Sequence, residues 1–185
     1  MVDLLHCISP VDGSVFVERP IADEQEISAA IARAQDASAA WRALTILDRQ
    51  SILSSAAEFL ESETDEIALE LTWQMGRPTH QARGELLGFA ERARHMTYIA
   101  NEALADIETD YLPGFNRFIR REPVGLVLVV APWNYPYLTA VNAVWPALLA
   151  GNTVILKHSH QTPLCSERFA SAMARASVPD GVFQP

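Results

Sequence analysis

The sequence predicts an α/β protein in which N-terminal helices are followed by the first half of a doubly wound parallel sheet. The first observation is that apolar residues recur at helical spacing between Asp23 and Ala100. The second is that the pattern changes after Pro113-Gly114 to short, continuous apolar runs. Such runs are typical of parallel strands that are buried on both faces. Together the two observations predict helices first and a β-α-β-α-β sheet after them.

The composition excludes several classes of function. The 185 residues include 14 Lys and Arg against 23 Asp and Glu, which gives a formal net charge of −9. A surface this acidic repels phosphate backbones and anionic lipid, so we expect neither nucleic-acid nor membrane binding. The N-terminus lacks the apolar segment of a signal peptide, and the longest aliphatic run is too short to span a bilayer. The two cysteines, Cys7 and Cys165, argue against a disulfide framework and favour a cytoplasmic protein.

The N-terminal third is predicted to be a turn, a short strand and a helix. The Asp-Gly pair within residues 9–14 favours a turn that leads into a strand beginning at Val15. Asp23 is the expected N-cap of the first helix, and Glu26 completes a capping box. The apolar face expected for this helix consists of Ile27, Ile31, Ala34, Trp41 and Leu44.

Three more helices are predicted between the first helix and Pro113. The second is expected to turn Ile52, Ala56, Phe59 and Leu60 inward. The third covers residues 64–75 and is ended by Gly76 and Pro78. The fourth has the clearest apolar stripe, with steps of four and three residues: Ala82, Leu86, Phe89, Ala93, Met96 and Ala100.

The chain is predicted to have three parts. Residues 1–113 form a helical N-terminal part of a cofactor domain, and residues 114–122 form an exposed edge strand or hairpin arm. Residues 123–185 form the sheet, with strands at 124–130 and 153–156 and a third beginning at Val182. A helix over 138–149 ends at Gly151, and Thr162 is expected to cap a further helix with Pro163 at its first position.

Two polar residues are expected at the carboxyl edge of the sheet, where open α/β proteins bind ligands. Asn134 comes just after the first buried strand, and Lys157 comes just after the second. The alternative for Asn134 is a turn-forming role before Tyr135-Pro136. The alternative for Lys157 is a solvated lysine at a strand end.

An ordered set of motifs closely resembles the NAD(P)-dependent aldehyde dehydrogenase superfamily. It consists of Glu122-Pro123-Val124-Gly125, Ala131-Pro132-Trp133-Asn134-Tyr135-Pro136, Pro146 to Val154, Lys157, and Gln161-Thr162-Pro163. Weaker similarity extends upstream, where Gly76-Arg77-Pro78 is similar to the family's Gly-Lys-Pro turn. The resemblance implies a partial aldehyde dehydrogenase-like fold and NAD or NADP as cofactor.

The resemblance also implies roles for individual residues. The Asn134 amide would stabilise the oxyanion that forms when a cysteine attacks the aldehyde, and Lys157 would bind the adenosine ribose of the cofactor. The other expected cofactor contacts are Val130, Ala131, Pro132, Trp133, Ser159 and His160. Trp133 has core packing as an alternative. The positions expected to shape the substrate tunnel are Tyr135, Leu138, Thr139 and Asn142, although Leu138 and Asn142 also simply share a helical face.

The stretch after Lys157 departs from the family pattern. His158-Ser159-His160 stands where many members have Pro-Ser-Glu, so the acidic residue expected on the ribose hydroxyls is replaced by His160. This replacement predicts tolerance of NADP. His158 and His160 could suggest a metal site, but the nearest third ligand, Cys165, lies inside the next helix, so we expect no metal.

The expected function is the oxidation of an aldehyde to a carboxylic acid with NAD(P) through a cysteine thiohemiacetal. The resemblance places the nucleophilic cysteine and the general-base glutamate beyond residue 185, so we expect an N-terminal portion that is inactive alone. It also implies a homo-oligomer of the complete protein, with the arm at 114–122 as a contact. The alternatives are a noncatalytic nucleotide-binding or assembly module, and a truncated remnant.

Overall fold

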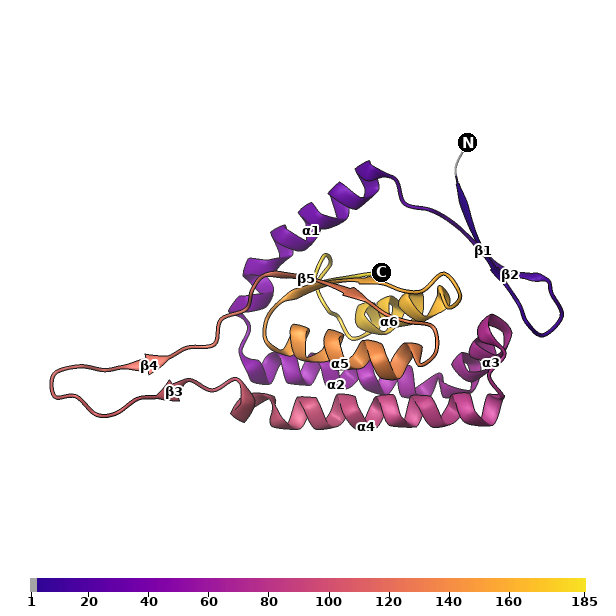
Figure 1. Ribbon diagram of the computed structural model, residues 1–185. Helices are drawn as coiled ribbons and strands as arrows, with labels where there is room; N and C mark the ends of the chain where they lie inside the picture. Colours follow the sequence, from indigo (N-terminus) through magenta and orange to yellow (C-terminus); the bar gives the residue numbers. More distant parts are fainter. Residues whose placement is uncertain (1–2) are drawn as a thin grey trace.

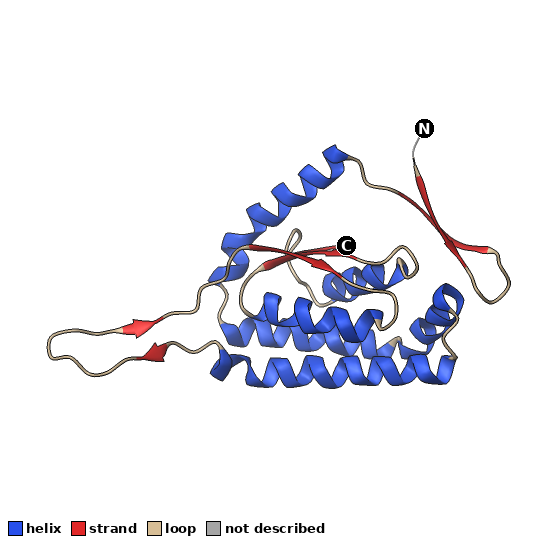
Figure 2. Ribbon diagram, in the orientation of Figure 1, coloured by secondary structure: helices blue, strands red, loops and turns tan. Residues whose placement is uncertain are grey.

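A computed structural model describes residues 3–185 of the chain (Figures 1 and 2). After an N-terminal pair of strands, helices precede the parallel sheet, and the predicted α/β class is confirmed. The helices are α1 (Glu24–Ala43), α2 (Ile46–Ser62), α3 (Thr64–Met75), α4 (Thr79–Ala103), α5 (Pro136–Leu149) and α6 (Leu164–Arg175). The strands are β1 (Leu4–Ile8), β2 (Val15–Pro20), β3 (Ile107–Glu108), β4 (Phe118–Ile119), β5 (Leu126–Val130), β6 (Thr153–Lys157) and β7 (Phe183–Gln184).

The parallel sheet has the strand order β5-β6-β7. α5 connects β5 to β6 and α6 connects β6 to β7, so the predicted β-α-β-α-β unit is confirmed. Both connecting helices lie on one side of the sheet, and α1 crosses its other side (Figure 1). α2 and α4 lie beneath α5 as a further layer (Figure 1).

The expectation that the first strand is buried on both faces is wrong for β5. Leu128 and Val130 are 64% and 67% exposed, whereas Val129 between them is 6% exposed. Because side chains alternate between the faces of a strand, β5 has one buried and one open face. α1 packs mainly along the central strand β6. Val154 and Leu156 of β6 lie on the same face as Val129 and are fully buried.

The predicted capping box of α1 is confirmed. The Asp23 side chain accepts from the Glu26 backbone N–H, and the Glu26 carboxylate accepts from the Asp23 backbone N–H. The predicted apolar face is confirmed only in the C-terminal half, where Trp41 is buried and its indole N–H donates to the Leu148 carbonyl over 3.0 Å. Ile27 and Ile31 are 50% and 38% exposed, although the Ala30 carbonyl in the same half of α1 accepts from the Gln184 side chain of β7.

The core lies between the helical layers and the sheet. The predicted stripe of α4 is buried except for Met96, which is partly buried. It meets a cluster of aromatic rings in which Phe89 of α4 makes edge contacts with Tyr137 and Trp145 of α5 and with Phe169 of α6. Edge-to-face ring contacts add to the free energy of burial, so this cluster joins α4, α5 and α6.

Two antiparallel strand pairs flank this core. β1 pairs with β2, as expected for the turn at residues 9–14, but the first strand of that pair was not predicted. β3 pairs with β4 and forms an arm that projects from the body (Figure 1). This arm begins at Ile107, before the predicted segment 114–122. Its start could not be recognised in the sequence, because a strand of two residues is too short to show an alternating pattern. Among residues 3–185, no helix is long and apolar enough to cross a membrane.

The predicted cap of the last helix is wrong. The N-cap of α6 is Pro163, and no side chain caps it. The Thr162 hydroxyl lies 3.2 Å from His158 Nδ1 instead. The hydroxyl therefore stabilises the turn after β6 rather than the helix end.

The close approach of Gly181 to α1 gives a stability prediction. Gly181 has φ of +82°, and a Cβ atom there would meet the Arg33 carbonyl oxygen at 2.5 Å. Gly181→Ala is expected to lower the free energy of unfolding by about 2 kcal/mol or more, because it adds strain and a clash with backbone. Gly84→Ala is the matched control, since Gly84 is exposed in α4 with open space at its Cβ position. The control should stabilise by about 0.5–1 kcal/mol in urea denaturation. Equal effects at both positions would contradict the packing of α1 on the turn before β7.

Candidate functional site

The parallel pairing of β5 with β6 brings two loops to one edge of the sheet. Val130 is paired with Lys157, and the Ala131 backbone N–H donates to the Lys157 carbonyl over 3.0 Å. The loop that begins at Ala131 and the turn that begins at His158 therefore start side by side. This is the carboxyl edge of the sheet, where the sequence predicts the site.

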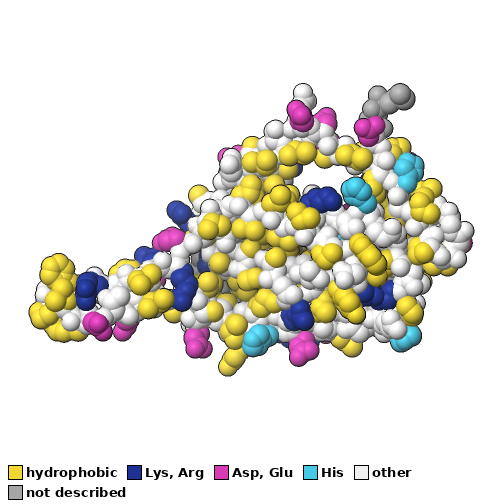
Figure 3. Space-filling model, in the orientation of Figure 1, with side chains coloured by type: hydrophobic (Ala, Val, Ile, Leu, Met, Phe, Trp, Pro, Cys, Tyr) yellow, Lys and Arg dark blue, Asp and Glu magenta, His cyan; other side chains and the backbone are white. Residues whose placement is uncertain are grey.

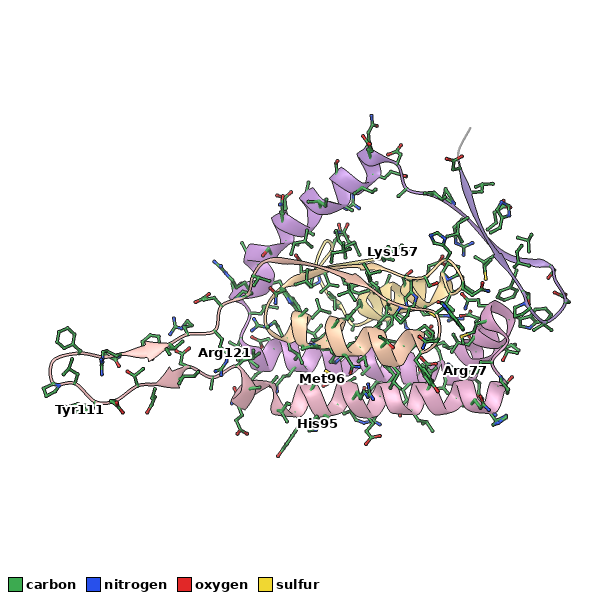
Figure 4. The ribbon with its side chains drawn as sticks, in the orientation of Figure 1. Arg77, His95, Met96, Tyr111, Arg121 and Lys157 are labelled. Atoms are coloured by element: carbon green, nitrogen blue, oxygen red, sulfur yellow. The ribbon has the colours of Figure 1, made fainter. Side chains whose placement is uncertain are left out.

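An open cleft of about 690 Å³ lies at this edge. This side of the molecule is hollowed between α1 and the β1–β2 hairpin (Figure 3), and Lys157 lies at the sheet edge there (Figure 4). The residues that line the cleft are Ile8, Pro10, Met75, Ala131, Pro132, Trp133, Lys157, Ser159, His160 and Gln161. The cleft thus brings together every predicted cofactor residue except Val130, whose side chain lies on the open face of β5.

Four lining residues were missed in the sequence: Ile8, Pro10, Met75 and Gln161. Ile8 and Pro10 belong to the N-terminal hairpin and its turn. Hydrogen bonds between residues far apart in the sequence connect this hairpin to the turn after β6. The Cys7 thiol donates to the Gln161 carbonyl over 3.2 Å, and the Gln161 amide donates to the Ile8 carbonyl over 3.3 Å. No local sequence signal indicates a wall built from segments so far apart.

The cleft favours an anion. Lys157 and His160 line it with exposed side chains, and none of its lining residues is Asp or Glu. Ser159 has its hydroxyl engaged, since it accepts from the Gln161 backbone N–H over 3.3 Å. An ammonium group at the mouth of a cleft without carboxylates can bind ribose hydroxyls or a phosphate group.

His158 is a buried part of the turn rather than a free ligand. Its Nδ1 accepts from the Ser159 backbone N–H over 3.2 Å and lies 3.2 Å from the Thr162 hydroxyl. Burial lowers the pKa of His158 to about 4, so the ring is neutral near pH 7. Within residues 3–185 no group of three metal-binding side chains occurs.

Asn134 lies one residue beyond the cleft lining, in the exposed loop before α5. Its side-chain amide has no hydrogen-bond partner among residues 3–185, so the amide is free to donate to a ligand. Its backbone carbonyl accepts from the Arg77 guanidinium. The Arg77 guanidinium also stacks on the Tyr135 ring, with its central carbon 4.3 Å from the ring centroid.

A buried acidic partner completes this arrangement. Glu85 of α4 forms an ion pair with Arg77, and the two side chains are 0% and 9% exposed. The Glu85 carboxylate also accepts from the backbone N–H groups of Tyr137 and Leu138 over 2.9 and 3.2 Å. The sequence did not reveal this pair, because a single Glu beside an apolar stripe resembles an ordinary solvated helix residue.

The predicted substrate residues lie at the start of α5 but do not share one cavity. Leu138 lines a groove of about 400 Å³ between α4 and α5, together with Gly88, Glu91, Arg92, His95 and Met96. Tyr135, Thr139 and Asn142 are exposed and do not line that groove. The Asn142 amide donates to the Leu138 carbonyl over 3.0 Å, as residues four apart on one helical face can do.

The comparison with known proteins agrees with this geometry. The sequence model of the aldehyde dehydrogenase family matches residues 3–185. The chain belongs to the aldehyde dehydrogenase family. The resemblance inferred from the motifs at residues 122–163 is therefore confirmed.

Relatives of this aldehyde dehydrogenase chain are longer than the chain itself. A succinate-semialdehyde dehydrogenase [NADP(+)] from Mycobacterium avium is 36% identical over 180 residues, which cover 96% of this chain and 38% of the relative. The NADP-dependent glyceraldehyde-3-phosphate dehydrogenase from Bacillus halodurans, solved with NADP, superimposes with a TM-score of 0.89 at 29% identity. PnpE, solved with nicotinamide adenine dinucleotide, superimposes with a TM-score of 0.92 at 30% identity. Both structures cover 98% of this chain, which spans 39% and 37% of theirs.

Neither cysteine of this aldehyde dehydrogenase chain is placed to act as a nucleophile. Cys7 is 1% exposed and Cys165 is fully buried. Burial raises the pKa of both thiols, and that of Cys165 is raised well above its usual range. A thiol held protonated away from the cleft is a small apolar side chain rather than a reactive group.

The buried His158 predicts a loss of stability in mild acid. The unfolded state binds a proton near pH 6.5, whereas the folded state binds it only near pH 4. As pH falls between these values the unfolded state is favoured, and the free energy of unfolding should fall by about 3 kcal/mol. Urea denaturation between pH 7 and pH 4 measures this slope in the wild type and in His158→Gln. The variant should lose most of the slope, while His80→Gln, a change at an exposed histidine, controls for the loss of any histidine. An unchanged slope in His158→Gln would contradict the burial of a neutral ring.

Proposed function

We propose that this chain supplies the cofactor cleft and the oxyanion loop of an enzyme that oxidises an aldehyde to a carboxylic acid with NAD or NADP. The main support is that Ala131–Trp133 and Lys157–His160, from two separate loops, line one cleft at the carboxyl edge of the sheet. Lys157 would bind the adenosine ribose, and the backbone of residues 131–133 would pack along the cofactor. The bound cofactor would accept the hydride.

The proposed reaction needs a thiolate from outside the described residues. The thiolate adds to the aldehyde carbon, and the carbonyl oxygen becomes an oxyanion. The free Asn134 amide would donate a hydrogen bond to this oxygen, an interaction worth about 10²–10³ in turnover in comparable sites. Removal of the hydride would leave a thioester on the sulfur, and water would hydrolyse it to the acid and the free thiol.

Substrate selection is proposed to involve Tyr135, Leu138, Thr139 and Asn142, at the start of α5. Support comes from Leu138, which follows the loop of Asn134 in the chain and lines the groove between α4 and α5. Succinate semialdehyde, the aldehyde in the name of the mycobacterial relatives, is the first compound to test.

We also place a self-association surface on the β3–β4 arm. Tyr111 and Phe115 belong to the segment between β3 and β4 and are 87% and 68% exposed, and Tyr111 lies at the tip of the arm (Figure 4). Exposed aromatic side chains on an open strand pair are typical of contacts between protein chains. This surface supports a homo-oligomer of the complete protein.

The first functional prediction is that the 185-residue polypeptide alone oxidises no aldehyde. Its two thiols are buried and protonated, so no nucleophile reaches the cleft. The assay is the absorbance of reduced cofactor formed from several aldehydes with NAD or NADP. Turnover that Cys165→Ser abolishes, and that Cys7→Ser leaves intact, would identify Cys165 as the nucleophile and contradict the prediction.

The second functional prediction concerns the choice between the two cofactors. A carboxylate at position 160 would repel the additional phosphate of NADP, and like charges about 4 Å apart cost between about 1 and 4 kcal/mol. His160→Glu in the complete enzyme should therefore weaken NADP binding by between about fivefold and several hundredfold. It should leave NAD binding unchanged or tighter. Calorimetric titration of both cofactors measures this difference.

His80→Glu is the control for this experiment, because it adds the same charge at an exposed position outside the cleft. It should leave both dissociation constants unchanged. A wild-type enzyme that already prefers NAD by a hundredfold would show that a residue other than the one at 160 excludes the phosphate.

A further inference from the structure

The N-terminus of α5 is capped by a side chain from another helix. The N-cap residue of α5, Tyr135, makes no side-chain capping hydrogen bond. Glu85 of α4 provides it instead, because its carboxylate accepts from the N–H groups of Tyr137 and Leu138. The first N–H groups of a helix need an acceptor, and a negative charge there interacts favourably with the helix dipole. α4 therefore determines where α5 begins.

Arg77 holds the two residues that precede this helix. One guanidinium nitrogen, Nη1, donates to the Glu85 carboxylate, and the other, Nη2, donates to the Asn134 carbonyl. The same planar group packs on the Tyr135 ring. Arg77 lies where α3, α4 and α5 meet (Figure 4). The pair thus fixes the backbone on both sides of the Asn134–Tyr135 step.

The burial of the Arg77–Glu85 ion pair restricts the movement of both side chains and of the backbone that they bind. The Glu85 side chain is fully buried, and burial raises its pKa, while the two backbone N–H groups and Arg77 act in the opposite direction. Each charge depends on the other, because a buried charge without its partner is strongly unfavourable. A nearby pair, Arg83 of α4 with Asp65 of α3, is exposed.

Arginine is suited to the three contacts that Arg77 makes. A guanidinium presents several donors in a fixed plane, so it serves Glu85 and the Asn134 carbonyl simultaneously and stacks on a ring. An ammonium group is a point charge and cannot maintain all three contacts in this geometry.

We infer that Arg77 and Glu85 are positioning residues for Asn134, and that they act by holding the backbone of residues 134–138 so that the Asn134 amide faces the reacting oxygen. This inference rests on the proposed oxyanion role of Asn134. The predicted effect is on turnover rather than on cofactor binding, because neither residue lines the cleft. Misplacement of a catalytic donor by about 1 Å can reduce turnover by about a hundredfold.

The first test measures the backbone directly and does not depend on the function. Amide hydrogen exchange is followed by NMR in the complete polypeptide, in the wild type and in Arg77→Met, Arg77→Lys and Glu85→Gln. The Tyr137 and Leu138 amides should exchange about tenfold faster or more in Arg77→Met and Glu85→Gln, because a charge-assisted acceptor is lost or weakened. The control Arg83→Met should change neither amide. Unchanged exchange in both Arg77→Met and Glu85→Gln would overturn the inference.

The second test is a double-mutant cycle in the complete enzyme. Arg77→Met should lower kcat by between about tenfold and a hundredfold with the cofactor dissociation constant unchanged, and Arg77→Lys should have a smaller effect in the same direction. If Arg77 acts through Asn134, the double variant Arg77→Met/Asn134→Ala should have the same kcat as Asn134→Ala alone. Additive losses would instead show a general structural effect and overturn the inference.

The two tests separate failure of the inference from failure of the proposed function. If the wild-type complete polypeptide oxidises no aldehyde, the proposed function fails, and the exchange rates still decide whether the pair holds the loop. If Arg77→Met does not fold, Arg77→Lys and Glu85→Gln keep the polarity of the site and provide the same comparison. Faster exchange together with an unchanged kcat in these conservative variants would also overturn the inference.

Discussion

The site depends on the parallel pairing of β5 with β6 in a single register. Because Val130 is paired with Lys157, the loop after β5 and the turn after β6 begin next to each other at the carboxyl edge of the sheet. A shift of one strand by one residue would turn its side chains to the opposite face and change the position of Lys157 relative to the Ala131–Trp133 backbone. The register is supported beyond the strands themselves, since Gly125 donates through its N–H to the Asn152 side chain and Thr153 donates through its N–H to the Gly125 carbonyl.

The polar groups buried around this edge hold backbone segments rather than ligands. Glu85 holds the start of α5, and His158 holds the turn after β6. Arg49 has a similar role at the opposite ends of helices, because its guanidinium donates to the carbonyls of Leu44 and Leu149 near the C-termini of α1 and α5. A cation is favourable there because the helix dipole places negative charge at that end. The buried charges of Glu85 and Arg49 thus provide caps that the residues at these helix ends do not provide themselves.

The sequence predicts what local rules determine. The capping box at Asp23 and the stripe of α4 follow from spacing along one segment, and the structure has both. The exposure of Ile27, Ile31 and Leu128 could not be predicted, because it depends on which surface lies opposite each of them in space. For the candidate site, the loops after β5 and β6 could be placed on one edge because parallel strands require it.

The rest of the site could not be predicted for the same reason. The wall formed by the N-terminal hairpin and the ion pair beneath Asn134 both join segments that are far apart in the chain, and the participating residues have no distinguishing pattern. In the sequence Arg77 could be noticed only as part of the Gly76-Arg77-Pro78 turn. Its two partners, Glu85 and the Asn134 carbonyl, become evident only when α3, α4 and α5 are packed together.

The contact of α1 with β7 has a consequence for the order in which the chain folds. The Gln184 amide donates to the Ala30 carbonyl, a contact across 154 residues, and the Arg33 side chain donates to the Gln184 carboxamide across 151 residues. During synthesis α1 can pack on β5 and β6 first, and it completes its docking only when β7 has left the ribosome. Contacts of such long range slow folding and leave apolar surface exposed meanwhile. The nascent chain thus passes through a period in which α1, the first helix to be made, lacks the part of its docking surface that β7 provides.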